Sequence, residues 1–500
     1  MPVNLNSILS DDLNSEFNAQ FPIFTYTLNQ MKHMYIDHPA SYTDYYELTM
    51  AQGYYLSNTH TKRSVFDYFF RKTPFGSGYV IYAGLKELVD TIKHIRFGPE
   101  ELDYLKREGF RDEFLNFLKE FTFKGDIWSV KEGEVIFPNE PVLRVEGNLL
   151  ETQIIETILL NILNFQSLIA TKASRIKFAA GEDSTVLDFG LRRAQGLAGI
   201  HATRAAMIGG FDGTSNVYSA QRFNIPAGGT MAHSWIQSFG DELTAFRTYC
   251  EHFPDSTHLL VDTYDTLGSG IPNAIIAARE LRERGHELKG IRLDSGDLAY
   301  LSKQARRMLD ENGLENVKIA ASNQLDERVI TSLKTQGAPI DIFGVGTRLV
   351  TGDKSPALDG VYKLSSIDGK PTLKISNNIE KITLPARKKI YRYLNGNQTF
   401  NGDAILLAEE KEPERMHHPN FPAQKTDLKN KQYEEILHPV IRNGNVVEEL
   451  PDVEEIITYK KERFKQLQPE YKRFENPHIY KVGISPRLME TRDQLLNSNK

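Results

Sequence analysis

Polar side chains able to bind a phosphate or a carboxylate recur after short apolar segments from about residue 185 onward. The buried strands of successive βα units end at one mouth of a barrel, so the polar groups after them can converge on one small molecule. Arginines, glycine loops, hydroxyls and carboxylates together suit a phosphorylated, metal-bridged substrate. The candidates are Arg192, Arg193, Asp212, Thr230, His233, Asp262, Asp265, Arg292, Asp294, Asp297, Ser322, Asn323, Gly344, Gly346 and Thr347.

A glycine run and two arginines are the candidate anion-binding groups. The glycines of Gly344-Val345-Gly346-Thr347 let backbone N–H groups approach a phosphate closely, although a lone Gly-x-Gly is as often a tight turn. The position of this run after a late strand favours the phosphate interpretation. Arg192 and Arg292 can each grip a carboxylate or phosphate through two parallel hydrogen bonds, or close the mouth of the fold with an ion pair.

Two aspartates precede a predicted helix that starts at Leu298. Asp297 is placed to cap that helix, and a catalytic role for it is no better supported than capping. Asp294 lies nearer the preceding strand, where it can meet a substrate hydroxyl or a magnesium-bound water. Asp294 is therefore the candidate metal ligand, and the other magnesium ligands stay unassigned.

His233 lies in the stretch Gly229 to Trp235 and has three open interpretations. It can be a structural histidine, a general base or the covalent carrier of a phosphoryl group. A metal site is disfavoured because no second histidine or cysteine lies at ligand spacing. Tyr46 suits either the core or a stacking contact with an aromatic substrate.

Repeated strand and helix patterns from about residue 184 predict the parallel sheet that would position these groups. Periodicity does not separate an open doubly wound sheet from a closed barrel, but polar residues follow almost every strand, and this favours the barrel. The predicted strands are Thr185–Phe189, Met207–Phe211, Leu259–Val261, Gly290–Leu293, Val317–Ala320 and Ile340–Val345.

The chain divides on these patterns into an N-terminal extension (1–40), an α+β domain (41–150), the barrel (151–365) and a C-terminal region (366–500). We expect the C-terminal region to pack partly on the α+β domain. The elements expected outside the barrel are strands over Ser64–Phe70 and Glu134–Val145, helices over Leu85–Ile95, Glu100–Glu120 and Val453–Leu467, and a hairpin turn at Asn395–Asn397.

The composition of the 500 residues limits the function classes. Lys and Arg number 60 against 66 Asp and Glu, so no overall basic field favours nucleic acid. Cys250 is the single cysteine, which suits a reducing compartment, and Met1–Gln20 lacks the pattern of a secretory signal. Polar residues interrupt the apolar stretch Ile154–Ala170, which we interpret as a buried helix. We expect a cytoplasmic protein that binds neither membrane nor nucleic acid.

Taken together, these segments resemble the nicotinate phosphoribosyltransferases over roughly residues 42 to 365. Their occurrence in the family's order is far more specific than any single motif. The matching segments are YTDYYELTMAQGYY, FFRKTPFGSGYVIYAGL, FPNEPVLRVEG, FGLRRAQG, GGFDGTSNV, GTMAHSW, LLVDTYDT, GIRLDSGDL, SNQLDE and GVGTRLVT.

The resemblance implies an irregular, TIM-like α/β barrel of the type II phosphoribosyltransferases, with an α+β N-terminal domain and a C-terminal extension. It also implies a homodimer in the salvage route to NAD. The implied reaction joins nicotinate to 5-phosphoribosyl 1-diphosphate, giving nicotinate mononucleotide and diphosphate. ATP hydrolysis is expected to be coupled to it, in the manner of a ligase, with Mg²⁺ as cofactor.

The resemblance also implies roles for single residues. His233 matches the histidine that ATP phosphorylates, and Asp188 stands where relatives often have glutamate, so it receives no role. Nicotinate is expected to meet Tyr46, Thr230 and Arg292, and phosphoribosyl diphosphate to meet Arg192, Asp294, Gly344, Gly346 and Thr347.

Two other functions stay open at the level of the sequence. A nicotinamide-using phosphoribosyltransferase would share the fold and most of the reaction, and Arg292 alone does not exclude it. A non-catalytic metabolite-binding barrel would keep the pocket without turnover, although it would have no need of a phosphoryl acceptor at His233. In a dimer, Tyr46 can also serve the neighbouring subunit's site.

Overall fold

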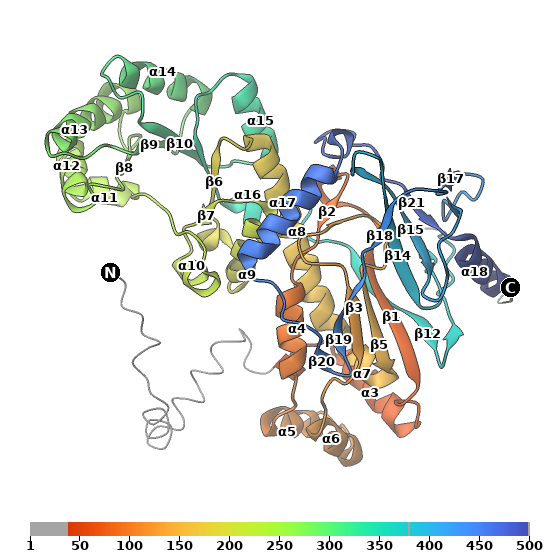
Figure 1. The fold of residues 1–500 in the computed structure, drawn as a ribbon. Helices are drawn as coiled ribbons and strands as arrows, with labels where there is room; N and C mark the ends of the chain where they lie inside the picture. The colour runs from red at the N-terminus through yellow and green to blue at the C-terminus, as the bar shows by residue number, and fades with distance from the viewer. Residues whose placement is uncertain (1–38, 379–380, 499–500) are drawn as a thin grey trace, which may run out of the picture.

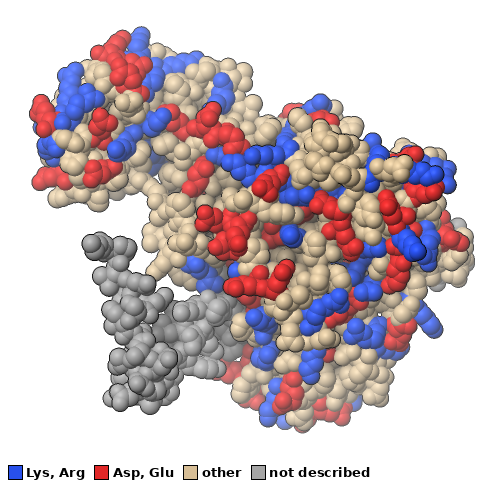
Figure 2. Space-filling model, viewed as in Figure 1, with Lys and Arg blue, Asp and Glu red and all other residues tan. Residues whose placement is uncertain are grey.

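The computed structural model describes residues 39–378 and 381–498, so the predicted extension over residues 1–40 lies almost wholly outside the described residues. Figure 1 shows a barrel-like part that carries β6 to β10 and α11 to α15, beside a larger body built on two large sheets and one two-stranded sheet. Helix α8 (Glu156–Ala180) lies between the two parts. Acidic and basic side chains are interspersed over the face shown in Figure 2.

The predicted parallel sheet is present, with the strand order β7-β6-β11-β10-β9-β8. Strands that are consecutive in the chain are neighbours in this sheet, and β11 also pairs with β6, so the strands form a ring. The exception is β7 and β8, which are not paired with each other. Among the described residues, a single bridge from Thr214 to Ala227 extends the sheet beyond β7. The fold is therefore an irregular α/β barrel with one open seam. Its strands are β6 (Thr185–Asp188), β7 (Gly213–Thr214), β8 (His258–Leu260), β9 (Gly290–Leu293), β10 (Lys318–Ser322) and β11 (Ile342–Val345).

Helices link these strands and cover the barrel (Figure 1). Alternation of strand and helix keeps all six strands parallel, so their carboxyl ends meet at one rim. The helices are α9 (Ala198–Gly209), α10 (Val217–Phe223), α11 (His233–Gln237), α12 (Glu242–His252), α13 (Ile271–Glu283), α14 (Leu298–Asp310), α15 (Glu327–Thr335) and α16 (Thr347–Val350).

One predicted strand of the barrel is wrong. Met207–Phe211 covers the end of helix α9 and the turn after it, and the strand follows only at Gly213. Helix α9 is buried along nearly its whole length, and a helix buried on all sides shows the same continuous apolar run as a buried strand. Gly209 allows close packing on α8, because a Cβ there would lie 2.4 Å from the Cβ of Ala173.

Helix α8 confirms the interpretation of Ile154–Ala170 as a buried helix. With α7 (Leu149–Ile154) it forms a 32-residue stretch that is long and apolar enough to cross a membrane by length and composition alone. Of its most apolar window, 67% is buried inside the structure, which is typical of a core helix. It packs against α9 and α15 on the barrel side and against α4 (Leu85–His94) on the other.

The second sheet gathers strands from distant parts of the chain in the order β13-β12-β1-β5-β3-β19-β20. The predicted strand β1 is an inner strand of this sheet, paired antiparallel with β12 and β5. Strands β19 and β20 come from the C-terminal region, so that region does pack on the N-terminal part. The strands are β1 (Arg63–Phe70), β3 (Asp126–Ser129), β5 (Leu143–Asn148), β12 (Gly360–Ile367), β13 (Lys370–Pro371), β19 (His438–Arg442) and β20 (Asn445–Val446).

Two predicted elements of the N-terminal part are each divided. The expected helix over residues 100–120 is α5 (Pro99–Arg107) and α6 (Asp112–Lys119), because Gly109 adopts a φ of 89° that ends the first helix. The expected strand over residues 134–145 is β4 (Val135–Ile136), which pairs with β2 (Val80–Ile81), followed by the separate strand β5. Helix α3 (Tyr45–Leu56) precedes β1.

The C-terminal sheet has the order β17-β16-β21-β15-β14-β18. The predicted turn at Asn395–Asn397 joins β14 and β15 in a hairpin, and the predicted helix is α17 (Val453–Gln466), which begins with a capping box of Asp452 and Glu455. The remaining bounds are β14 (Lys388–Leu394), β15 (Phe400–Leu407), β16 (Arg415–His417), β17 (Lys425–Asp427), β18 (Tyr433–Glu435), β21 (Val482–Ile484) and α18 (Pro486–Ser498).

A buried ionic network fastens this sheet to the N-terminal part. The guanidinium of Arg392, which is fully buried, donates to Asp403 at 2.6 Å and to Glu134 at 2.7 Å. Glu134 also accepts from Arg463 of α17 at 2.8 Å, and the hydroxyl of Tyr480 donates to Asp403 at 2.8 Å. Every charge in the network has a partner, as burial of charge demands.

We predict that Arg392→Met lowers the free energy of unfolding by about 3–5 kcal/mol, since it leaves the buried carboxylate of Asp403 without a cation and Glu134 with Arg463 alone. Urea titration measures the change. Arg107→Ala, at an exposed site on α5, is the matched control and should stay within about 0.5 kcal/mol of the parent. Equal stability of the two variants would show that the network does not hold the C-terminal sheet.

Candidate active site

An ion pair at the carboxyl end of β9 forms the centre of the candidate site. Arg292 Nη2 donates to Asp294 Oδ1 at 2.7 Å, and Nε donates to the hydroxyl of Ser322 at the end of β10, at 2.9 Å. Nη1 donates to the hydroxyl of Thr230 at 3.0 Å. The Ser322 hydroxyl also donates to Asp294. Two neighbouring strands and the loop before α11 therefore meet at one guanidinium.

Asp294 is charged at neutral pH. Burial raises the pKa of its carboxyl, but the hydrogen bond from Ser322 and the positive charge of Arg292 outweigh burial, and the pKa lies below its usual value. Arg292 itself is nearly buried. The predicted anion-binding arginine and the predicted metal ligand are therefore in direct contact.

Asp262 follows β8 and adds a second carboxylate beside Asp294. Its Oδ2 accepts from the backbone N–H of Asp294 at 2.8 Å and from the hydroxyl of Ser295 at 2.7 Å. Its Oδ1 is buried and has no hydrogen-bond donor among the described residues. An unpartnered carboxylate oxygen next to a second carboxylate suits a divalent cation or a substrate hydroxyl. The sequence marked Asp262 as a candidate without assigning it a role.

His233 is the first residue of α11 and faces the same carboxylate. Its Nδ1 lies 3.1 Å from the hydroxyl of Thr263, and its Nε2 lies 4.0 Å from Asp294 Oδ2. The side chain is 41% exposed, so the ring is held at one nitrogen and open to solvent at the rim. A histidine buried for structural reasons alone would not be this exposed.

The glycine run at the end of β11 lies against the end of β6. A Cβ at Gly344 would lie 2.4 Å from the ring of Phe189, and one at Gly346 would lie 2.9 Å from the Phe189 carbonyl oxygen. These glycines therefore serve packing first, and Thr347 then starts the short helix α16. The predicted phosphate contacts stay a prediction.

Phe189 is the site residue that reasoning from the sequence missed. Its ring centroid lies 5.5 Å from the guanidinium carbon of Arg292, which places an aromatic face beside the ion pair. The signal was present in FGLRRAQG, where an aromatic residue is the last residue of a predicted strand. Arg192, three residues further on, is exposed in the turn Leu191–Arg193 at the same end of β6.

Two aspartates have structural roles. Asp297 caps α14, because its carboxylate accepts from the backbone N–H groups of Ala299 at 3.1 Å and Tyr300 at 3.0 Å. Capping, one of its two open interpretations, is confirmed. Asp188 is buried at the end of β6 and accepts hydrogen bonds from Thr203 and Thr214, and burial raises the pKa of its carboxyl.

Tyr46 is not brought to this site within one chain. It lies on α3, which Figure 1 shows at the far side of the molecule from β8, β9 and α11. Its side chain is 46% exposed, and partial burial beside Glu156 and Glu47 raises the pKa of its hydroxyl. A contact between Tyr46 and a ligand of Arg292 therefore requires a second copy of the chain.

Three family models cover most of the chain. The nicotinate phosphoribosyltransferase N-terminal domain matches residues 42–164, the family model itself matches residues 184–413, and the C-terminal domain matches residues 387–492. The chain belongs to the nicotinate phosphoribosyltransferase family. The match extends beyond residue 365, where the resemblance read from motifs ended.

Relatives in the nicotinate phosphoribosyltransferase family span nearly the whole chain. The enzyme of that name from Bacillus subtilis is 44% identical over 475 residues, which cover 93% of this chain and 96% of the relative. The one from Caenorhabditis elegans is 36% identical and covers 90% and 92%. The crystal structure of human nicotinic acid phosphoribosyltransferase superposes with a TM-score of 0.82 at 30% identity, covering 91% of this chain and 99% of that one.

The buried carboxyl of Glu47, next to Tyr46 on α3, makes the stability of the protein depend on pH. Glu47 is fully buried, and burial raises its pKa to about 7, against the opposing hydrogen bond from Gln153 at 2.8 Å. Because the folded pKa exceeds the unfolded value of 4.5, folding binds a proton, and stability is lost as pH rises from 4.5 toward 7.

We therefore predict that Glu47→Gln gains stability over the parent as pH rises, by about 1–3 kcal/mol at pH 8 and far less at pH 5. Urea unfolding at both pH values measures the difference. Glu113→Gln, at an exposed site on α6, should show no such trend. A constant difference between Glu47→Gln and the parent across this range would contradict the raised pKa.

Proposed function

We propose that the chain transfers the phosphoribosyl group of 5-phosphoribosyl 1-diphosphate to nicotinate in NAD biosynthesis. The pyridine nitrogen forms a bond to C1 of the ribose as the bond from C1 to the diphosphate oxygen breaks, giving nicotinate mononucleotide and diphosphate. The observation that carries this proposal is the guanidinium of Arg292 beside the Phe189 ring at the rim of the barrel, in a chain of this family.

Nicotinate fits the position between Arg292 and Phe189 because it combines a carboxylate with a flat ring. The carboxylate would accept hydrogen bonds from Arg292 and from the hydroxyl of Thr230, which lie 3.0 Å apart. The pyridine ring would lie on the face of Phe189. Nicotinamide has no negative charge to match the guanidinium, so the arrangement favours the acid.

The two carboxylates of the rim suit Mg²⁺. Asp294 is charged and Asp262 has one buried oxygen without a donor, which is the kind of oxygen that a hard divalent cation takes as ligand. Bound there, Mg²⁺ would neutralise charge on the diphosphate leaving group. Arg192 and the N–H groups around Gly346 and Thr347 would hold the phosphates of the sugar.

We further propose that ATP phosphorylates His233. If Nδ1 carries the proton and donates to Thr263, the lone pair of the exposed Nε2 is free to attack the γ-phosphorus, and ADP leaves. Water later hydrolyses the phosphohistidine to histidine and phosphate. The phosphoryl group would place about two negative charges beside Asp294 and reorganise the rim through new contacts with its cations.

The assay that tests the main proposal mixes pure protein with phosphoribosyl diphosphate and either nicotinate or nicotinamide. Release of diphosphate with nicotinate, and little with nicotinamide, is the expected result. Binding of both substrates without release would instead identify a non-catalytic binding protein. Equal turnover of the acid and the amide would contradict the role of the Arg292 charge.

Arg292→Gln should raise the KM for nicotinate by about 30-fold or more, because loss of one partner of a buried charged contact costs about 2–5 kcal/mol. The KM for phosphoribosyl diphosphate should change much less. Steady-state kinetics with each substrate varied in turn measures both. Arg307→Gln, at an exposed site on α14, is the control. Equal increases in both KM values would indicate general damage rather than loss of carboxylate binding.

His233→Ala should lose incorporation of label from γ-labelled ATP and lose the stimulation of turnover by ATP. Turnover without ATP should persist, because Arg292, Asp294 and Phe189 stay in place. His252→Ala, at an exposed histidine at the end of α12, should keep both properties. Full stimulation together with label uptake in His233→Ala would refute a phosphohistidine at this position.

We also propose a homodimer in which Tyr46 of one copy completes the rim of the other. A mixture of Tyr46→Ala and His233→Ala, each expected to lack ATP-stimulated turnover, should then recover part of that stimulated activity, since mixed dimers hold one intact site. Activity after unfolding and refolding the two together measures this. No recovery, in a mixture shown to contain mixed dimers, would exclude the sharing of sites.

A further inference from the structure

The guanidinium of Arg292 is almost fully occupied by groups of its own chain. Nε donates to Ser322 and Nη2 donates to Asp294, which lie at the carboxyl ends of β10 and β9. Nη1 donates to the hydroxyl of Thr230 at 3.0 Å and to the carbonyl oxygen of Met231 at 3.4 Å. Of the five N–H groups of an arginine, only one, on Nη2, has no acceptor among the described residues. A carboxylate held by two parallel N–H groups therefore requires that one of these acceptors leaves.

The Met231 carbonyl is the acceptor that leaves most easily. Its distance of 3.4 Å from Nη1 is near the outer limit for a hydrogen bond, whereas the charged Asp294 lies at 2.7 Å. The loop before α11 is also weakly held, because the backbone N–H groups of Gly229, Thr230 and Met231 have no acceptor in the described chain. A segment with so few backbone hydrogen bonds opens at little cost.

Two glycines begin this loop, and packing does not explain them. A Cβ at Gly229 would have no atom within 4 Å, and one at Gly228 would meet only the side chain of Leu187, at 3.8 Å. Neither glycine has the left-handed φ that disfavours other residues. The bridge from Ala227 to Thr214 ends the strand pairing directly before them. Backbone freedom is the property of glycine that remains to explain this pair.

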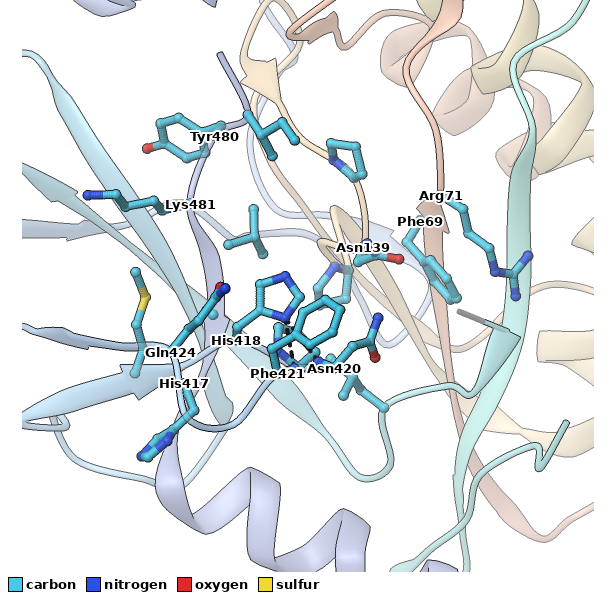
Figure 3. A pocket seen from close by; sticks show the side chains of 18 of the residues that line it. Phe69, Arg71, Asn139, His417, His418, Asn420, Phe421, Gln424, Tyr480 and Lys481 are labelled. Atoms are coloured by element: carbon cyan, nitrogen blue, oxygen red, sulfur yellow. Dashed lines mark hydrogen bonds between the residues drawn. The ribbon is translucent and has the colours of Figure 1, made fainter. Parts of the chain in front are cut away.

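A glycine in the wall of a cleft elsewhere in the molecule shows the contrast. The cleft, of about 1040 Å³, lies around Arg71 and Phe421 between the N-terminal and C-terminal sheets (Figure 3). Gly78 lines it, and a Cβ there would lie 2.4 Å from the carbonyl oxygen of Tyr471. Packing therefore requires glycine in that wall, as it does at Gly344 on the barrel rim, whereas it leaves the loop before α11 free to change its backbone.

We propose that the Met231 carbonyl is a latch, which occupies Arg292 until a carboxylate ligand displaces it. Gly228 and Gly229 form the hinge of this movement. Rotation of the backbone at the hinge takes the carbonyl away from Nη1, and the released N–H then binds the ligand together with the unused N–H of Nη2. The hydroxyl of Thr230, which now donates to the Met231 carbonyl at 3.3 Å, can turn to the ligand as well.

The choice of nicotinate as the ligand rests on the proposed function. The hinge itself depends neither on turnover nor on ATP, because it follows from the hydrogen bonds of Arg292 and from the open space at Gly229. Two measurements on the full-length protein can therefore test the latch and the ligand separately.

The first measurement is the affinity of Gly229→Ala for nicotinate. The new Cβ fits the open space, so the latched state is kept while the backbone loses freedom. Calorimetric titration should give a Kd for nicotinate about threefold to tenfold above that of the parent, with an equal or higher Tm. Gly396→Ala, in the turn between β14 and β15, is the matched control, because a Cβ there also has no atom within 4 Å. Its Kd should equal that of the parent.

The second measurement follows the latch directly through the methyl group of Met231. The chain contains nine methionines, so ¹³C-methyl labelling of methionine gives a simple NMR spectrum, in which Met231→Leu identifies the signal. In the free protein this signal should show exchange between two states on the microsecond to millisecond timescale. Nicotinate should move it to one shifted position, and Gly229→Ala should suppress the exchange.

The results distinguish failure of the latch from failure of the proposed function. Nicotinate binding that leaves the Met231 signal unchanged and is not weakened by Gly229→Ala would overturn the latch alone. Exchange that Gly229→Ala suppresses, in a protein that does not bind nicotinate, would support the hinge and remove nicotinate as its ligand. A single Met231 signal that nothing changes, together with no binding of nicotinate, would overturn both.

Discussion

The contact between Arg292 and Asp294 determines the arrangement of the whole rim. A guanidinium as buried as that of Arg292 needs a matching negative charge, and Asp294 supplies it at 2.7 Å. The same contact fixes Ser322 at the end of β10 and Thr230 in the loop before α11. Because Asp294 also faces His233, one ion pair sets the positions of the groups proposed to bind nicotinate, metal and the phosphoryl group.

Close backbone approach is the second requirement of the site. The absence of a side chain at Gly344 lets the ring of Phe189 lie across the end of β11, and from there the ring reaches the guanidinium of Arg292. A glycine required for packing and a glycine used for phosphate binding leave the same pattern in the sequence. Here the structure shows the packing requirement, whereas the contact between these glycines and a phosphate belongs to the proposed function.

Much of this fold could be predicted because strands and helices alternate so regularly after residue 184. The wrong strand at Met207–Phe211 arose because α9 is buried on all sides, which removes the periodicity that marks a surface helix. The open seam between β7 and β8 could not be predicted, since pairing between distant strands leaves no local pattern. For the same reason, the sheet that collects β12 and β19 around β1 was only partly expected.

For the site, the residue types after each strand correctly indicated Thr230, His233, Arg292 and Asp294 as neighbours. Phe189 was missed because aromatic residues are usually core, and only the 5.5 Å approach to Arg292 distinguishes it. Tyr46 is the converse case: the family resemblance assigned it to the nicotinate site, but its place on α3 separates it from the rim within one chain. The cleft around Arg71 and Phe421 is built from segments more than three hundred residues apart, which no motif could join.

The most direct test of the central claim is an experimental structure of the protein with nicotinate and diphosphate bound. The nicotinate carboxylate should lie within hydrogen-bonding distance of Arg292, about 2.7–3.2 Å, with its ring on Phe189. The diphosphate should lie on the side of Asp294 and His233. Nicotinate bound away from Arg292, with the Arg292–Asp294 pair unchanged and facing solvent, would show that this ion pair does not form the nicotinate site.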